Sequence, residues 1–297
     1  MPGVAFVVNG SLVRGSGHFL ALCREAAARH GWRAEFLVTD KAEAGVAAAN
    51  SAALDGIDLV VAVGGDGTVR GCAEGLARTG VPLGIVPHGT ANLLARTLRI
   101  PGHPRAALAV ALAVTREAGA VDRTIDLAVA DDVPFTAMAG MGLDAAVVAG
   151  TRLKHQFGWL AYAMSGAVHL TLPPTRFSIR LDGGAPVERT ARSVVVGNSG
   201  LLPGGFSLLP DARPDDGLLD VGVLAPHGPF GWPRVATRVL AHSHREDRML
   251  ERFQARQVEI IASAPLPREI DGELVATSRS LTVGVQPGAL TVRMPRL

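Results

Sequence analysis

Residues 59–68 read LVVAVGGDGT, and this stretch decides how the first half of the chain folds. The short apolar run Leu59–Val63 predicts a buried strand, and the glycine-rich turn after it cannot extend that strand. A helix is expected from Val69 to about Arg78, with Thr68 as its N-cap. A strand, a glycine turn and a helix in this order present backbone N–H groups and a positive helix end, which together favour phosphate binding.

Asp66 stands inside this turn, and its carboxylate would repel a phosphate group placed beside it. A Mg²⁺ ion between the two groups removes the repulsion, so the turn predicts a nucleotide bound with magnesium. Two other phosphate motifs are excluded. The chain holds no Gly-Lys pair and therefore no Walker A loop, and Arg70 occupies the last glycine position of the dinucleotide fingerprint.

The segment Gly64–Thr68 resembles the signature shared by diacylglycerol kinases, sphingosine kinases, NAD kinases and phosphofructokinases. Taken alone, it also fits an ordinary tight turn with a capping aspartate. A second segment, Gly89–Asn92, follows the apolar run Leu83–Val86 and is similar to the Gly-Thr-x-Asn segment of the diacylglycerol kinase catalytic family. The chain departs from many members of that family at Leu93, where they carry Asp.

The resemblance implies nucleotide contacts at the ends of several strands. Asn9 and Ser11 match a family loop after the first strand, although Gly10 replaces its proline, and Thr39 ends the second strand as a threonine does in the family. The carboxyl ends of parallel strands meet at one edge of a sheet, where ligands bind. The implied nucleotide-binding residues are Asn9, Ser11, Thr39, Gly64, Gly65, Asp66, Gly67, Thr68, Thr90 and Asn92.

The pattern of apolar residues along the sequence changes near residue 122. Before it, apolar runs alternate with helical segments, which predicts an α/β domain with a parallel sheet covered by helices. After it, short alternating apolar runs such as Arg176–Leu181 predict an antiparallel β-sandwich. We therefore expect an α/β nucleotide-binding domain over residues 1–122 and an all-β substrate domain over residues 123–297. The last strand, Ala289–Met294, is a candidate to return to the first domain.

The second half also resembles the lipid kinase family in several places, in the same order along the chain. Asp126 matches an acidic position near the cleft between the two domains of the family, and Asp271, in an Asp-Gly-Glu segment, matches the family's catalytic base. The segments at residues 140–144, 158–162 and 197–199 also match. The resemblance implies a structural Mg²⁺ site made by Asp215, Leu218 and Asp220, and carboxylates beside a strand-start carbonyl suit such a cation. An acidic turn before a strand is the alternative.

The amino-acid composition limits the classes of partner that we expect for the chain. The 29 basic and 27 acidic residues nearly balance, and no basic stripe with interleaved aromatic residues predicts binding to nucleic acid. Two cysteines in predicted helices, with no signal peptide and no apolar run long enough to span a bilayer, predict a cytoplasmic protein. An arginine-rich helix expected over Arg234–Gln257 would meet an anionic bilayer, or would instead be a solvated helix packed on the sandwich.

Together these features predict ATP-dependent transfer of the γ-phosphate to the hydroxyl of a lipid, diacylglycerol or a similar molecule, at a membrane surface. Asp66 would hold Mg²⁺, Asp271 would take the hydroxyl proton, and Asp126 would support the metal or the substrate. Two alternatives remain open. One is a soluble small-molecule kinase of the NAD kinase type, and the other is a catalytically silent nucleotide-binding regulator, which Leu93 motivates.

Overall fold

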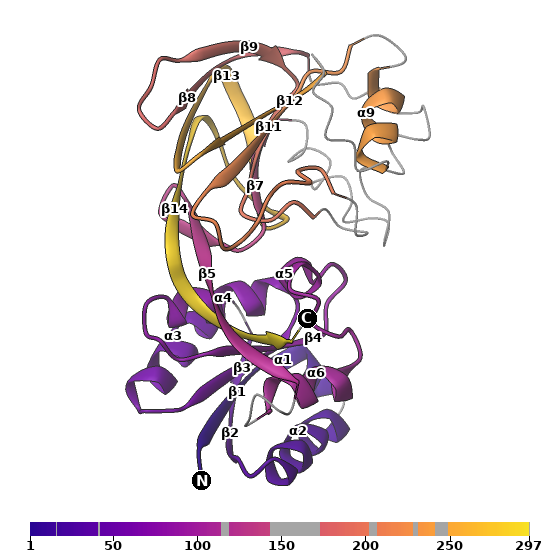
Figure 1. Cartoon of the computed structure of the whole chain (residues 1–297), viewed down its shortest axis with the longest axis vertical. Helices are drawn as coiled ribbons and strands as arrows, with labels where there is room; N and C mark the ends of the chain where they lie inside the picture. Colours follow the sequence, from indigo (N-terminus) through magenta and orange to yellow (C-terminus); the bar gives the residue numbers. More distant parts are fainter. Residues whose placement is uncertain are drawn as a thin grey trace. The chain divides into compact units, whose positions relative to one another are not determined.

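The computed structural model describes residues 1–15, 17–40, 42–113, 119–142, 173–201, 207–227, 231–240 and 249–296. The chain forms two compact units (Figure 1). The first unit comprises Met1–Leu127 and Gly288–Leu297, and the second comprises Ala128–Pro287. Two long strands, β5 (Ala120–Ala130) and β14 (Glu273–Pro295), run from one unit into the other.

A parallel sheet forms the centre of the first unit. Its strands lie in the order β4-β3-β1-β2, and the last part of β14 pairs parallel with β4. The strands are β1 (Gly3–Asn9), β2 (Arg33–Thr39), β3 (Leu59–Gly64) and β4 (Leu83–Pro87). All six residues of β3 are buried, as expected for an apolar strand with neighbours on both sides.

Helices cover both faces of this sheet. They are α1 (Gly10–Gly15), α2 (Gly17–Arg29), α3 (Ala42–Leu54), α4 (Asp66–Leu76), α5 (Leu93–Thr97) and α6 (Pro104–Ala111). The chain moves from β1 to β2 in one direction and from β2 through β3 to β4 in the other. Because such crossovers are right-handed, α2 lies on one face and the pair α3 and α4 on the opposite face (Figure 1). The sheet therefore has a topological switch point between β1 and β3.

The start of α4 differs from the sequence prediction. The helix begins at Asp66 rather than Val69, with Gly65 in an extended conformation as its N-cap and no side-chain capping bond. Thr68 lies inside the first turn and is not the N-cap, because its backbone N–H donates to the Gly65 carbonyl at 3.1 Å. The earlier start places the Asp66 carboxylate at the positive end of the helix, where negative charge is stabilised.

The second unit is antiparallel, and the predicted fold class of both halves is confirmed. Its strand order is β12-β11-β10-β7-β13, and β8 and β9 continue from the first part of β13. The strands are β6 (Val133–Phe135), β7 (Met138–Gly142), β8 (Thr175–Leu181), β9 (Val187–Ala191), β10 (Ser193–Gly197), β11 (Leu219–Leu224), β12 (Leu250–Ala255) and β13 (Gln257–Ile270).

The long strand β13 pairs with two different strands of this unit, and an ion pair connects its end strands. β13 pairs with β8 through residues 258–262 and with β7 through residues 268–270, and its register with β14 shifts in between. Arg189 on β9 and Glu251 on β12 form a two-bond ion pair at 2.9 Å, although these strands are the two ends of the pairing path. This side-chain contact joins the two end strands of the antiparallel unit, which have no backbone pairing with each other among the described residues.

The predicted helix Arg234–Gln257 is wrong in extent. The helix α9 covers only Gly231–Leu240, and the chain runs as strand β12 from Leu250 because it pairs with β11. Val235 and Val239 are fully buried, so these two positions are not available to enter a bilayer. Residues 241–248, which hold two of the predicted membrane-facing arginines, lie outside the described residues. Among the described residues, no helix is long and apolar enough to cross a membrane.

Two glycines at the contact between α3 and α4 give a stability test. A Cβ added at Gly75 would lie 2.4 Å from the Val46 carbonyl oxygen, whereas one added at Gly45 would meet its nearest neighbour, the Gly71 Cα, at an ordinary 3.8 Å. We expect Gly75→Ala to lower the free energy of unfolding by about 1–3 kcal/mol. Gly45→Ala should raise it by about 0.5–1 kcal/mol through helix propensity.

Urea unfolding of both variants and of the parent measures these changes. The two substitutions are chemically identical and lie in two helices that pack against each other, so each is the control for the other. Equal effects of the two substitutions would contradict the close approach of α4 to α3 at Gly75.

Candidate active site

The two glycine turns of the first unit are in backbone contact. The first follows β3 and the second follows β4, which is its neighbour in the sheet. The His88 N–H donates to the Gly64 carbonyl at 2.7 Å. A Cβ placed on Gly89 would lie 2.6 Å from the Gly65 Cα, so no side chain fits between the turns at this position. The glycines are needed because two backbones approach here.

The Asp66 carboxylate joins the two turns. Its Oδ2 accepts the Asn92 N–H at 2.8 Å, and its Oδ1 accepts the Leu93 N–H at 2.6 Å. Asn92 adopts a left-handed conformation with φ of 48° and directly precedes α5. Asp66 is therefore an anchor for the second turn, a contact that the sequence analysis did not foresee. Its predicted role as a Mg²⁺ ligand stays a prediction.

Asn92 supplies a buried acceptor beside this contact. Its Nδ2 donates to the Gly89 carbonyl at 2.7 Å. Its Oδ1 is buried and has no hydrogen-bond partner among the residues that the structure describes. A buried acceptor without a donor is costly, so the described residues leave the hydrogen bonding of this oxygen incomplete. Thr90, in contrast, is exposed.

The other predicted nucleotide-binding residues lie along the same carboxyl edge of the sheet. Asn9 and Thr39 are paired at the ends of β1 and β2. The Asn9 Oδ1 accepts both the N–H and the hydroxyl of Ser11, and its Nδ2 lies 3.5 Å from the Thr68 Oγ1. Asn9 thus connects β1 to the turn after β3, across the switch point, where open α/β sheets bind ligands.

Asp126 is an anchor of a similar kind in the first unit. It lies on β5 and is 3% exposed, and its Oδ1 accepts the Gly288 N–H at 2.8 Å. Gly288 has a φ of 60° and is the residue at which β14 enters the first unit. This bond fixes the path of the returning strand. A role of Asp126 toward metal or substrate stays a prediction.

Asp271 lies in the second unit, at the tip of a hairpin. Ile270 and Glu273 are paired, and Asp271 and Gly272 form a two-residue loop in which both φ angles are positive. This is the geometry of a type I′ turn, for which Asp-Gly is a preferred sequence. The Asp271 carboxylate accepts four hydrogen bonds, from the N–H groups of residues 136, 137 and 138 and from the Thr136 hydroxyl, at 2.9–3.2 Å.

The predicted metal residues lie on one acidic connection before and within β11. Asp220 is 4% exposed, its Oδ1 accepts a bond from Gln254, and its Oδ2 has no partner among the described residues. The pKa of Asp220 is raised to about 6, mainly by burial and in smaller part by the negative charges of Asp216 and Asp211, against the lowering effect of the hydrogen bond from Gln254. Asp215 instead faces Arg213 at 3.4 Å. In the described part of the chain, no cluster of three or more His, Cys, Asp or Glu residues is arranged for a metal ion.

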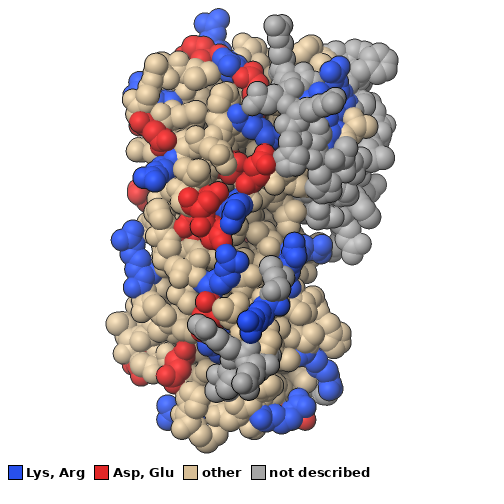
Figure 2. Space-filling model, in the orientation of Figure 1, with Lys and Arg blue, Asp and Glu red and all other residues tan. Residues whose placement is uncertain are grey.

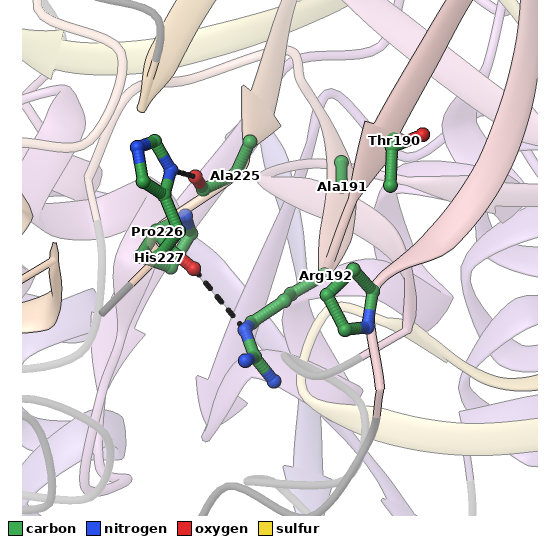
Figure 3. Close-up of a pocket in the computed structure, with 7 residues that line it drawn as sticks. Thr190, Ala191, Arg192, Ala225, Pro226 and His227 are labelled. Carbon is green, nitrogen blue, oxygen red and sulfur yellow. Dashed lines mark hydrogen bonds between the residues drawn. The ribbon is translucent and has the colours of Figure 1, made fainter. Parts of the chain in front are cut away.

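The other surface features of the described residues contain none of the residues predicted for the nucleotide or metal sites. A hollow of about 270 Å³ in the second unit is lined by Thr190, Ala191, Arg192, Ala225, Pro226, His227 and Pro174 (Figure 3). The Arg192 Nε donates to the Pro226 carbonyl there. On the face that Figure 2 shows, Lys and Arg side chains are interspersed with Asp and Glu. Burial raises the pKa of both cysteine thiols, Cys23 and Cys72, to about 12, so neither is a reactive group at neutral pH.

The two halves match two known domain types. Residues 4–123 match the diacylglycerol kinase catalytic domain, and residues 137–294 match the YegS C-terminal NAD kinase beta sandwich-like domain. The chain therefore belongs to the family of YegS-like lipid kinases and diacylglycerol kinases, and the resemblance noted from its motifs is confirmed.

Individual relatives agree with this family. The chain is 36% identical over 253 residues to a probable lipid kinase YegS-like of Pseudomonas aeruginosa (strain UCBPP-PA14), covering 81% of this chain and 78% of the relative. It is 33% identical over 233 residues to a diacylglycerol kinase of Bacillus subtilis (strain 168), covering 76% and 74%. The fold matches the crystal structure of a diacylglycerol kinase from Bacillus anthracis str. Sterne with a TM-score of 0.70 and 21% identity, over 99% and 97% of the two chains.

The contact made by Asp66 can be tested without nucleotide. In Asp66→Asn, an NH₂ group replaces one acceptor and faces a backbone donor, so at least one of the two bonds is lost. We expect the amide hydrogens of Asn92 and Leu93 to exchange about 10-fold faster or more, a change that corresponds to about 1.4 kcal/mol of local protection. Hydrogen exchange read by NMR measures this directly.

Asp55→Asn is the matched control, because Asp55 is an exposed aspartate of the same unit whose side chain accepts a hydrogen bond from the Ser51 hydroxyl, within its own helix region. It should leave both exchange rates unchanged. Unchanged rates in Asp66→Asn as well would show that Asp66 does not hold the second turn.

Proposed function

We propose that the protein is an ATP-dependent lipid kinase that transfers the γ-phosphate to the hydroxyl of diacylglycerol or a similar lipid. The observation that carries this proposal is the junction of the two glycine turns through Asp66, at the carboxyl ends of β3 and β4 and next to the switch point between β1 and β3. Family membership supports the use of ATP. The acceptor is proposed because relatives of this chain are named as a lipid kinase and a diacylglycerol kinase.

The residues of the first unit would bind and orient the nucleotide. The glycine turn and the start of α4 offer backbone N–H groups and a positive helix end to the phosphates. Thr90 and Asn92 would offer hydrogen bonds to the phosphates or the ribose. Asp66, already engaged by two N–H groups, would hold a Mg²⁺ ion through its remaining lone pairs, and that ion would neutralise charge on the phosphates during transfer.

Asp271 would receive the proton of the attacking lipid hydroxyl in place of the Thr136 hydroxyl, whose bond at 3.2 Å is the longest of the four that its two oxygens accept. Its four hydrogen-bond donors stabilise negative charge on the carboxylate, which makes it a well-oriented acceptor rather than a strong base. Phosphoryl transfer has a loose transition state that demands positioning more than proton abstraction. A rigid carboxylate that orients the hydroxyl therefore suits this reaction.

We also propose that Asp220 takes part in holding a structural divalent cation, with Asp215 and the Leu218 carbonyl as the other candidates. The supporting observation is the Asp220 Oδ2, a buried carboxylate oxygen without a partner among the described residues. A hard cation would satisfy this oxygen and offset the cost of burying its charge.

The lipid kinase proposal is tested by incubating the protein with labelled ATP, Mg²⁺ and a total lipid extract, with NAD⁺ in a parallel reaction. We expect a phosphorylated lipid and no NADP⁺. Asp271→Asn should lower the turnover by about 100-fold or more with nucleotide affinity unchanged, because the nucleotide turns belong to the other unit.

Asp132→Asn is the matched control, since Asp132 is an exposed aspartate with positive φ in a turn of the same unit, and it should retain full activity. Labelled NADP⁺ as the main product would point to the NAD kinase type. ATP binding without any labelled product would point to a silent regulator, for which the buried Leu93 is the motivating departure.

The cation proposal is tested through stability. In the presence of a chelator, the pKa of Asp220 is about 6 in the folded parent and 3.8, its ordinary value, in the unfolded chain. The folded state therefore binds this proton more tightly, and the free energy of unfolding falls as the pH rises from about 4 to about 6. Asp220→Asn removes this cost. Between about pH 4 and pH 6, the free energy of unfolding of the variant, measured with urea, should rise relative to that of the parent by about 1–2 kcal/mol.

Adding Mg²⁺ at neutral pH should raise the melting temperature of the parent and not that of Asp220→Asn. A parent whose melting temperature does not respond to Mg²⁺ or to chelator would leave the segment as an ordinary acidic turn.

A further inference from the structure

Glu269 is a buried carboxylate beside the proposed catalytic turn. It lies on β13, where it is paired with Gly140 of β7 on one side and Leu274 of β14 on the other, and it is only 4% exposed. A buried carboxylate is costly unless it is hydrogen-bonded, and glutamate is among the residues that are rarely buried without a partner. No local sequence pattern distinguishes this residue, because its importance depends on the turn that follows it.

The Glu269 carboxylate binds the backbone of that turn. Its Oε2 accepts the Gly272 N–H at 2.7 Å. In a two-residue type I′ loop, the second loop residue does not take part in the strand ladder, so this bond is additional to the hairpin itself. A Cβ added at Gly272 would meet no atom within 4 Å, so no neighbouring residue packs against Gly272 on that side.

The other half of the turn is held by Asp271. Its carboxylate accepts the N–H groups of residues 136–138, and its own N–H donates to the Met138 carbonyl at 2.8 Å. Glu269 and Asp271 therefore hold the tip from opposite ends: Glu269 fixes Gly272, while Asp271 is bound to the start of β7. An error in the orientation of Gly272 would be passed to Asp271 through the shared peptide unit.

We propose that Glu269 is a positioning residue for Asp271, acting as the hydrogen-bond acceptor that fixes the Asp271–Gly272 turn in the orientation needed for phosphoryl transfer. This role rests on the proposed function of Asp271. It requires an acceptor oxygen at the right distance and does not require a negative charge. Glutamine can supply that oxygen, whereas alanine cannot.

Turnover of the full-length protein tests the proposal. Glu269→Ala should lower kcat by about 100-fold, the scale of a misplacement of about 1 Å, with KM for ATP within about twofold of the parent. Glu269→Gln should retain kcat within about threefold. Glu259→Ala is the matched control, because Glu259 lies on the same strand in a half-exposed ion pair with Arg180 and should leave kcat unchanged.

A purely structural role would lower the melting temperature of both Glu269 variants without separating their kcat values. Loss of kcat in Glu269→Gln equal to that in Glu269→Ala, or full activity in Glu269→Ala, would overturn the proposal.

Hydrogen exchange gives a second readout that does not depend on activity. In Glu269→Ala, the amide hydrogens of Gly272 and of residues 136–138 should exchange faster, while Glu269→Gln should preserve their protection. If the parent phosphorylated no lipid, the proposed function would fail, and these exchange rates would still decide whether Glu269 holds the turn. Unchanged protection of Gly272 in Glu269→Ala would overturn the positioning role regardless of activity.

Discussion

The two hydrogen bonds from the backbone of Asn92 and Leu93 to the Asp66 carboxylate are the interaction on which the candidate site depends. They join a turn after β3 to a turn after β4, and they act in a place where Gly65 and Gly89 already touch. Charge-assisted bonds of this length are among the stronger hydrogen bonds in proteins. The carboxylate also sits at the start of α4, where the helix favours its charge. A single side chain thus fixes both segments that would contact a nucleotide.

The other carboxylates considered as functional groups work in a related way. Asp126 accepts the N–H of Gly288, Asp271 accepts those of residues 136–138, and Glu269 accepts that of Gly272. In each case a negatively charged side chain holds backbone from a different strand or turn. The arrangement lets a loop at a strand end keep one geometry without large side chains filling the space. Phosphoryl transfer requires a rigid site, because positioning of the reacting groups supplies most of the rate acceleration.

Much of the fold could be predicted from the sequence because it follows from local periodicity. The buried run of β3, the alternation of strands and helices, and the antiparallel second half were all expected, and the fold class and family are confirmed. The helix expected after Arg234 failed because strand β12 forms by pairing with β11, a tertiary contact that overrides helical spacing. The partners of Asp66 and Asp271 could not be foreseen, since they lie 26 and 135 residues away in the sequence and depend on the finished fold. Glu269 gave no local signal at all.

The central claim is that the joined glycine turns form a nucleotide-phosphate site. It is tested most directly by mapping where a non-hydrolysable ATP analogue with Mg²⁺ protects backbone amides from hydrogen exchange. The account predicts added protection in both turns of the parent, residues 64–68 and 89–93, and weakened protection in both when Asp66 is replaced by Asn. Binding of the analogue that protects neither turn would contradict it.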